Sequence, residues 1–168
     1  MFVVEKENIL KMTKNGTENF LNAFNVSTDR LFSLLVECEK DLNNPKLNSE
    51  LFAAVVSSAH SLLDCWERRD IKKSLDPTEV NIMNAFRFAN NQIKHNINLI
   101  EVHKRTGGIS FPMVFPLVIP QIQFMWTHID RPVEEEFVSK WQIYCDNLEG
   151  KTIKDSFDAA SKILKNAL

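Results

Sequence analysis

The sequence predicts a mainly α fold, a helical bundle of about five or six helices with an extended, proline-containing β-hairpin or arm at residues 109–126. The 168 residues include only 4 Gly and 6 Pro, which argues against an all-β fold with many tight turns. Apolar residues recur at helical spacing through most of the chain, whereas Pro112, Pro116 and Pro120 exclude a helix between them. A chain of this length is most simply one domain, residues 1–168.

The N-terminal quarter is expected to contain three helical segments. Residues 4–14 are weakly helical, and Asn15-Gly16 is a turn signal. Thr17 is expected to cap a short helix that carries Phe20 and Phe24. Ser27 or Thr28 then caps a third helix that ends near Leu42, before the helix-breaking residues Asn43-Asn44-Pro45.

The two helices expected next are the longest in the chain. One covers about residues 48–73 and has a wide apolar arc, which implies burial on more than one side. The other begins at Asp76-Pro77-Thr78-Glu79, which combines an N-cap, a proline at the first helical position and a glutamate placed for a capping box. It is expected to reach about Lys104, where Lys104 and Arg105 suit the helix C-terminus and Gly107-Gly108 ends it.

The C-terminal third begins with the proline-containing arm, in which Ile122, Phe124 and Trp126 are expected to share one face. A helix follows at about residues 130–148, with an apolar stripe formed by Val133, Phe137, Trp141, Tyr144 and Leu148. Gly150 ends this helix, and Thr152 begins the last one, whose inward residues are Ile153, Phe157, Ala160 and Leu164.

Composition and cysteine spacing exclude several classes of protein. The net charge of −2 provides no general attraction to nucleic acid or anionic membranes. Cys38, Cys65 and Cys145 are far apart and form no CxxC pair, so they are expected to be reduced thiols. The chain contains no apolar run that could span a bilayer and no N-terminal signal peptide, so no membrane partner and a cytoplasmic location are expected.

The stretch from Arg87 to Asn96 contains the residues whose chemistry most suggests a binding site. Arg87, Asn91 and His95 recur at every fourth position and are expected to lie along one side of the long helix, with Lys94 and Asn98 beside them. His95 can exchange a proton near neutral pH, and Arg87 and Lys94 can bind phosphate. An ordinary solvent-facing helix surface is the alternative interpretation of the same pattern.

The sequence Asn90-Asn91-Gln92-Ile93-Lys94-His95 resembles the motif of HEPN domains (higher eukaryotes and prokaryotes nucleotide-binding). That motif is an Arg, often followed by Asn, and then a His after four to six intervening residues, late in a long helix of an all-α bundle. Asn91 and His95 match it, whereas Asn90 stands where the family has its Arg, and Arg87 lies less than one turn before Asn90.

The resemblance implies an RNA- or nucleotide-binding protein of a toxin or phage-defence type, acting as a homodimer and without metal. His95 would then be catalytic, acting on the ribose hydroxyl or the leaving oxygen, and Arg87 would stabilise the phosphate charge. Asn90, Asn91, Lys94 and Asn98 are the expected ligand-binding residues. Because the motif lacks its Arg, the sequence leaves open whether the protein is an enzyme.

No cofactor or metal is expected. His95 and His103 are two helical turns apart if the long helix continues to Lys104, and no HExxH motif occurs. Gly107-Gly108 follows a helix, the reverse of the order in a phosphate-binding loop.

A non-enzymatic interaction or scaffold protein, acting through a dimer or partner interface, is the alternative function. The two hypotheses differ in what they expect at His95. A binding site requires a concave surface there, and an interaction protein does not.

Overall fold

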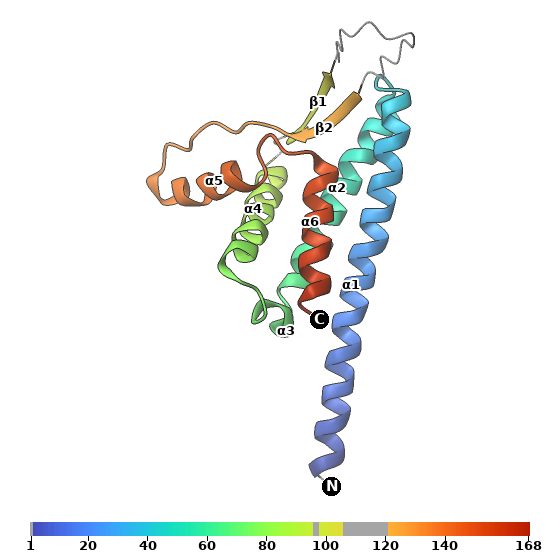
Figure 1. Ribbon diagram of the computed structural model, residues 1–168, viewed down its shortest axis with the longest axis vertical. Coiled ribbons are helices and arrows are strands. Elements are labelled where there is room, and N and C mark those ends of the chain that lie inside the picture. The colour runs from blue at the N-terminus through green and yellow to red at the C-terminus, as the bar shows by residue number, and fades with distance from the viewer. Residues whose placement is uncertain (1, 96–97, 106–120) are drawn as a thin grey trace, which may run out of the picture.

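The computed structural model describes residues 2–95, 98–105 and 121–168, and in these ranges the side chains from residue 16 onward except those of residues 69, 70, 105 and 121. The elements in chain order are α1 (Phe2–Lys40), α2 (Pro45–Trp66), α3 (Arg69–Lys72), α4 (Pro77–Lys94), β1 (Ile100–Arg105), β2 (Gln121–Trp126), α5 (Glu135–Asn147) and α6 (Ile153–Asn166) (Figure 1). A mainly helical bundle with a two-stranded hairpin confirms the predicted fold class.

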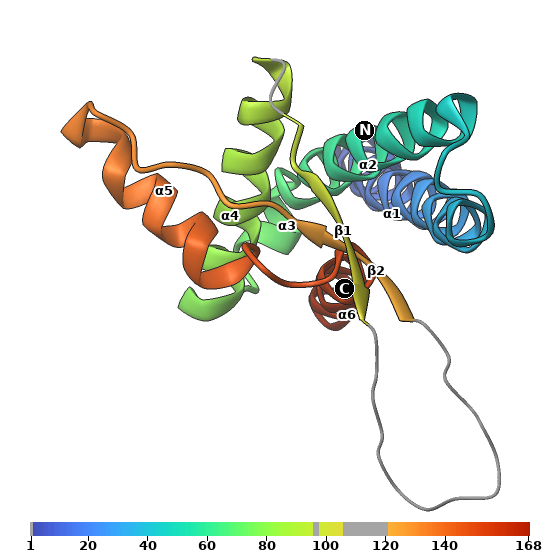
Figure 2. The same cartoon turned by 90° about the horizontal axis from the view of Figure 1, so that it is seen from above.

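The helices form a bundle with the hairpin at one end. Helices α1 and α2 run antiparallel and side by side, and α4 packs on α2 (Figures 1 and 2). Helix α6 contacts α1, α2 and α4, while α5 packs on α4 and forms the outer edge of the molecule. The hairpin lies near the turn between α1 and α2, where β2 contacts α6.

Helix α1 is continuous through the turn signal at Asn15-Gly16, so the prediction of three separate helices in this region is wrong. Tertiary contacts favour helix at these positions: Thr17 and Phe24 are buried, and the guanidinium of Arg68 lies over the ring of Phe20, 4.9 Å from its centroid. A Cβ at position 16 would be 3.0 Å from the Arg68 Nη2 atom, so Gly16 leaves room for that side chain. Burial of this face offsets the roughly 1 kcal/mol by which glycine disfavours a helix.

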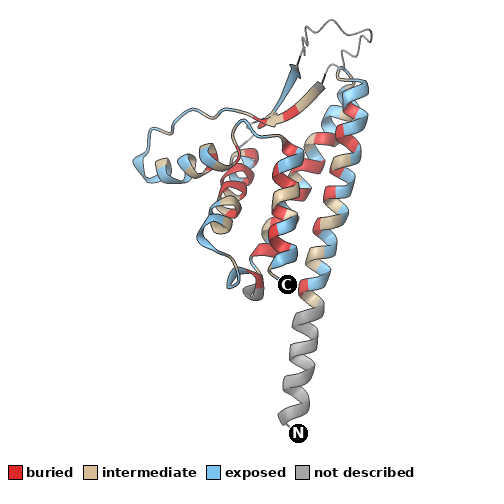
Figure 3. Cartoon of the chain, in the orientation of Figure 1, coloured by how far each residue is buried: buried red, intermediate tan, exposed pale blue. Residues whose placement is uncertain are grey.

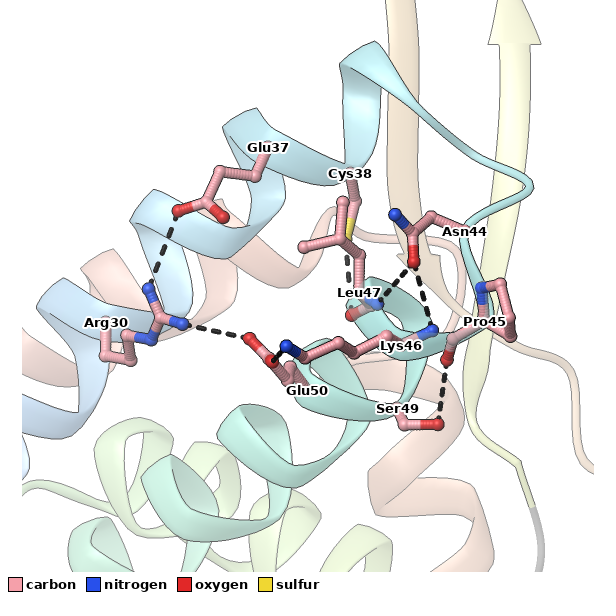
Figure 4. A network of polar contacts seen from close by, with 9 residues as sticks. All are labelled: Arg30, Glu37, Cys38, Asn44, Pro45, Lys46, Leu47, Ser49 and Glu50. Atoms are coloured by element: carbon pink, nitrogen blue, oxygen red, sulfur yellow. Dashed lines mark hydrogen bonds and ion pairs between the residues drawn. The ribbon is translucent and has the colours of Figure 1, made fainter.

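The turn between α1 and α2 is held by side chains from both helices (Figure 4). The Oδ1 atom of Asn44 accepts hydrogen bonds from the backbone N–H groups of Lys46 and Leu47, at 3.1 and 3.2 Å, and so caps α2. Arg30 on α1 pairs with Glu50 on α2 at 3.0 Å. The Asn-Asn-Pro sequence therefore ends one helix and begins the next at Pro45, three residues before the expected start.

Helix α2 ends at Trp66, earlier than the expected Lys73, and the short α3 follows. The apolar arc that was expected on this helix is buried as predicted, including Leu51, Val55, Ser58, Leu62 and Trp66. Helix α4 then begins as predicted. Asp76 accepts a hydrogen bond from the Glu79 N–H at 2.9 Å, and the Glu79 carboxylate accepts one from the Asp76 N–H at 3.0 Å, which completes the capping box.

Helix α4 ends at Lys94, with His95 as its C-cap, and the expected extension to Lys104 is wrong. Residues 100–105 form strand β1, antiparallel to β2, with Ile100 opposite Trp126 and Val102 opposite Phe124. The local signal for this strand is the alternation of apolar and polar residues in Ile-Glu-Val-His, a period of two that the helical interpretation did not consider. Hydrogen bonding to β2 stabilises the strand conformation of these residues over the helix.

The predicted arm at 109–126 is confirmed in part. Residues 121–126 form β2, and Phe124 and Trp126 are buried on the face where they were expected. Residues 109–120 of the arm, and Gly107-Gly108, lie outside the described residues. The partner of β2 is β1, and its residues 100–105 lie before the range predicted for the arm.

The start of α5 was predicted too early. The helix begins at Glu135, and the preceding residues form an extended connection from β2. Val133 and Phe137 were expected to be buried but are exposed, by 93% and 41%. Gly150, with φ of +70°, forms the turn between α5 and α6, and Thr152 caps α6 as predicted.

Buried residues lie along the facing sides of the helices (Figure 3). An aromatic cluster at the centre of the bundle joins four elements. The Phe157 ring of α6 lies 5.0 Å from Phe86 of α4, 6.2 Å from Trp126 of β2 and 6.5 Å from Phe24 of α1, measured between centroids. All four side chains are essentially fully buried. This cluster holds the hairpin and the C-terminal end of α4 against the bundle, and so positions the groove described next.

Candidate functional site

A groove of about 720 Å³ lies between the C-terminal half of α4, the connection from β2 to α5, and α5 itself. We call it the α4–α5 groove. It is lined by Phe88, Asn91, Gln92, His95, Asn98, Thr127, His128, Ile129, Asp130, Pro132, Glu134, Phe137 and Lys140. In Figure 1 the connection leaves β2 and passes the upper end of α4, and α5 then returns toward that helix; Figure 2 shows α5 beside α4.

The wall formed by the connection is anchored on both sides of His128. The Tyr144 hydroxyl of α5 donates a hydrogen bond to the Thr127 carbonyl at 2.7 Å, and the Trp141 indole N–H donates one to the Ile129 carbonyl at 2.7 Å. The Thr127 N–H donates to the Leu99 carbonyl at 2.9 Å. Because the residues before and after it are tied to α5 and to the start of β1, His128 has a defined position.

His128 is also held through its ring. Its Nδ1 atom lies 2.8 Å from the Glu149 Oε1 atom, and its Nε2 atom lies 3.5 Å from the Asp130 Oδ1 atom. The Glu149 side chain is only 25% exposed, whereas the Asp130 side chain is fully exposed. The carboxylate on Nδ1 is therefore the more rigid partner, and it orients the ring with Nε2 on the opposite side.

These contacts change the protonation of both partners. The hydrogen bond to Glu149, and then the charge of that carboxylate, raise the pKa of His128 above its ordinary value. Burial acting alone would raise the pKa of Glu149, but hydrogen bonds from Cys145 and His128 outweigh it, so that the pKa is lowered. The pair therefore favours an imidazolium beside a carboxylate.

Three of the residues predicted as a site come together in this groove. Asn91 lines it from the last turns of α4, and His95 from the C-cap of that helix. Asn98 lines it from the start of the β1 region, where its Oδ1 atom also accepts a hydrogen bond from the Ile100 N–H at 3.1 Å. Asn98 reaches the groove because the chain leaves the helix, and not through the helical spacing on which its prediction was based.

The other three predicted residues do not line the groove. The Arg87 guanidinium pairs with the Glu67 carboxylate and lies over the Trp66 ring, 4.4 Å from its centroid, so it faces α2. Asn90 is buried, with 5% of its surface exposed, and Lys94 is exposed to solvent. The structure thus separates Arg87 from His95.

The sequence reasoning missed the side of the groove formed by residues 127–140. The His128 side chain is 62% exposed, and its carboxylate partners lie 2 and 21 residues away in the sequence. Phe137 was assigned to the core and instead lies exposed at the groove, with the Lys140 ammonium 5.6 Å from its ring centroid. The sequence contains no local signal for the contact between His128 and Glu149.

The groove has a mixed charge, and the two cations expected to bind phosphate, Arg87 and Lys94, do not line it. Among its described lining residues Lys140 is the permanent cation, and Asp130 and Glu134 are the carboxylates. His95 and His128 add positive charge only when protonated. A ligand in the groove would contact mainly amide groups, imidazoles and an aromatic ring, and few cations.

Cysteine and metal chemistry find little support in the described part of the chain. Cys38, Cys65 and Cys145 are free thiols, and burial raises the pKa of Cys65 to about 11 and that of Cys145 to about 12. Such thiols are poor nucleophiles near neutral pH. No group of three or more His, Cys, Asp or Glu side chains in the described residues is arranged to hold a metal ion. In the same residues, no helix has the length and apolar character needed to cross a bilayer.

The chain matches no protein-family model, no curated protein and no solved structure.

Proposed function

We propose that the α4–α5 groove binds single-stranded RNA or a nucleotide, as the HEPN-like motif suggested, and recognises the base more than the phosphate. The observation that carries the proposal is the convergence of Asn91, His95 and Asn98 with the exposed ring of Phe137 on one concave surface. Amide groups both donate to and accept from base edges. Unstacked bases bind on aromatic rings such as Phe137.

The charge of the groove supports base recognition. Lys140 and protonated histidines provide one to three cations, while Asp130 and Glu134 oppose close contact with several phosphates. The carboxylates can accept hydrogen bonds from the amino groups of bases. Binding should therefore depend only weakly on salt, because few phosphate charges are neutralised.

Fluorescence anisotropy with a short, labelled single-stranded RNA of mixed sequence tests the proposal. Phe137→Ala should weaken binding by about 1–3 kcal/mol, the loss expected for one stacked base. Asn91→Ala should weaken it by about 1 kcal/mol through lost hydrogen bonds. Val133→Ala is the matched control, because Val133 is an exposed apolar residue next to the groove that does not line it. Equal affinity in all four proteins, or no binding by the unaltered chain, would contradict the proposal.

A second candidate function is a non-enzymatic interaction protein that acts through a homodimer or a partner interface. Val133 and Phe137 favour it, since both expose apolar surface on the outer edge of the molecule. Sedimentation velocity of the protein and of Val133→Glu would test it. If α5 forms a dimer interface, the unaltered chain should sediment as a dimer and Val133→Glu as a monomer. A monomer in both cases would leave the groove as the functional surface.

A further inference from the structure

We propose that His128 is a proton-transfer residue of the α4–α5 groove: its imidazolium protonates the leaving 5′ oxygen as a bound RNA strand is cleaved, while His95 accepts the proton of the attacking 2′ hydroxyl. This inference rests on the proposed RNA-binding function and extends it to a reaction.

The first argument is the position of the two imidazoles. His95 and His128 lie on different elements, at the C-cap of α4 and in the β2–α5 connection, and both line the same groove. Both side chains are exposed to solvent and neither packs in the hydrophobic core. Two proton-exchanging groups on one concave surface provide the acid and the base that such a reaction needs.

The second argument is that His128 is oriented by a group that does not itself line the groove. Glu149 contacts the Nδ1 atom at 2.8 Å from the turn after α5, and its side chain is mostly buried. An acceptor at Nδ1 leaves Nε2 as the nitrogen that can deliver a proton, and it stabilises the charged ring. Asp130, near Nε2 at 3.5 Å, is fully exposed and free to move aside for a ligand. In this arrangement Glu149 is a positioning residue.

The third argument is the balance of charge around the ring. The carboxylates that act on His128 are Glu149 from the turn after α5, Asp130 from the connection and Glu101 from β1. The cationic groups that share the groove with it are Lys140 from α5 and His95 from α4. Three carboxylates against one permanent cation favour the charged form of His128. Because Glu149 also orients its ring, we assign His128 as the acid and His95, the other imidazole of the groove, as the base.

The reaction is balanced without any other reagent. Neutral His95 takes the proton of the ribose 2′ hydroxyl, and the 2′ oxygen forms a bond to phosphorus. The bond from phosphorus to the 5′ oxygen breaks, and that oxygen takes its proton from the His128 imidazolium. The products are a 2′,3′-cyclic phosphate and a free 5′ hydroxyl, and His95 and His128 have exchanged protonation states.

The experiment separates binding from cleavage. Binding is measured with a labelled 2′-O-methyl RNA, which lacks the attacking hydroxyl, and cleavage with the same sequence as RNA. With the protein in saturating excess, His128→Gln should cleave bound RNA about 10²–10⁴-fold more slowly. Its affinity for the methylated strand should fall only by the smaller factor expected for the loss of one cation from the groove. His60→Gln is the matched control, because His60 on α2 has a comparably exposed side chain beside a carboxylate and lies outside the groove. Circular dichroism verifies that each variant is folded.

A substrate with a good leaving group distinguishes an acid from a merely structural histidine. Nucleoside 3′-(4-nitrophenyl) phosphates, supplied as a mixture of the four bases, release a phenolate that needs no proton. His128→Gln should therefore hydrolyse them at the rate of the unaltered protein, while His95→Gln remains slow. In Glu149→Gln the alkaline limb of the pH–rate profile for RNA should move to lower pH, because the acid loses the carboxylate that favours its charged form.

Each outcome is decisive. If the methylated RNA does not bind, the proposed function fails and this inference fails with it. If it binds but RNA remains intact, the inference is wrong and the binding function stands. The inference is also wrong if His128→Gln cleaves RNA normally, or if it is equally slow with both kinds of substrate.

Discussion

Arg87 and His95 lie two turns apart on one helix, and their neighbours give them different roles. The Arg87 side chain is 41% exposed, pairs with Glu67 and stacks on the buried Trp66, so its charge already has partners from α2. The His95 side chain is exposed to solvent and lines the α4–α5 groove. Two residues at the same helical spacing therefore lie in different surroundings, Arg87 against α2 and His95 at the groove.

Arg87→Ala tests this distinction. It should lower the free energy of unfolding by about 1 kcal/mol, because an exposed ion pair contributes little and the cation–π contact about 0.5–1 kcal/mol. Affinity for single-stranded RNA should not change. Urea unfolding and fluorescence anisotropy provide the two measurements. A loss of RNA affinity in a folded Arg87→Ala protein would return Arg87 to the site and contradict the assignment made from its contacts.

His128 and Glu149 should make stability depend on pH in a defined direction. The folded-state pKa of His128 is raised from 6.5 by Glu149, so their interaction stabilises the fold fully below that value and is lost as the pH rises through the higher folded-state pKa. Melting temperatures of the unaltered protein and of Glu149→Gln should differ most near about pH 6 and least near about pH 9. Because its pKa is lowered, Glu149 stays ionised between about pH 6 and pH 9 and does not itself make the melting temperature depend on pH.

The same substitution in a His128→Gln background is the control for that measurement. Without the imidazole, Glu149→Gln should shift the melting temperature equally at both pH values. A pH-dependent difference that persists in the double variant would assign the effect to another titrating group.

At the scale of elements, α4 was predicted well at its start and poorly at its end. Its N-terminus is decided within four residues, because Asp76 and Glu79 satisfy each other's backbone N–H groups. Its C-terminus depends on β2, a strand that begins 27 residues after Lys94. No property of residues 95–104 taken alone excludes the longer helix, although the alternation from Ile100 to His103 already favours a strand.

Asp76→Ala should remove the capping box and destabilise the protein by about 1 kcal/mol, within the usual range of about 0.5–2 kcal/mol for the loss of an N-cap. The urea midpoint should fall while the slope of the transition stays constant. Thr78→Ala is the control at the same end of the helix, because Thr78 is exposed and outside the capping box. A change as large in Thr78→Ala as in Asp76→Ala would assign the effect to general helix propensity.

At the scale of the whole molecule, one aromatic cluster connects the hairpin with the bundle. Phe157 contacts Phe24, Phe86 and Trp126, which belong to α1, α4 and β2. Their burial explains why the chain after α4 folds back as a strand over α6. It also explains why the groove at the end of α4 has a fixed wall.

Phe157→Ala should destabilise the protein by about 3–5 kcal/mol, because it leaves a cavity among fully buried rings. A loss of that size is a large fraction of the roughly 5–15 kcal/mol that stabilises a typical domain. Phe137→Ala, at an exposed position, should cost well under that. Denaturant unfolding of both variants is the measurement, and equal losses would show that α5 has the same energetic weight as the core.

The features that the sequence determined by itself are those with a local cause. Helical apolar spacing identified α2 and α6 and their buried faces, the Asp-Pro-Thr-Glu sequence identified the start of α4, and alternation identified the buried face of β2. The polar stretch also contains Asn91 and His95, which line the groove together with Asn98, although Asn98 reaches it by leaving the helix.

Tertiary structure alone decided the continuity of α1, the end of α4, the pairing of β1 with β2, and the separation of Arg87 from His95. It also brought His128 to the groove with Glu149 behind it. These features depend on contacts between residues distant in sequence, such as Arg68 over Phe20, Trp66 under Arg87 and Tyr144 bound to Thr127. Local propensities differ by only about 1 kcal/mol per residue, so burial of a few aromatic and aliphatic side chains is enough to override them.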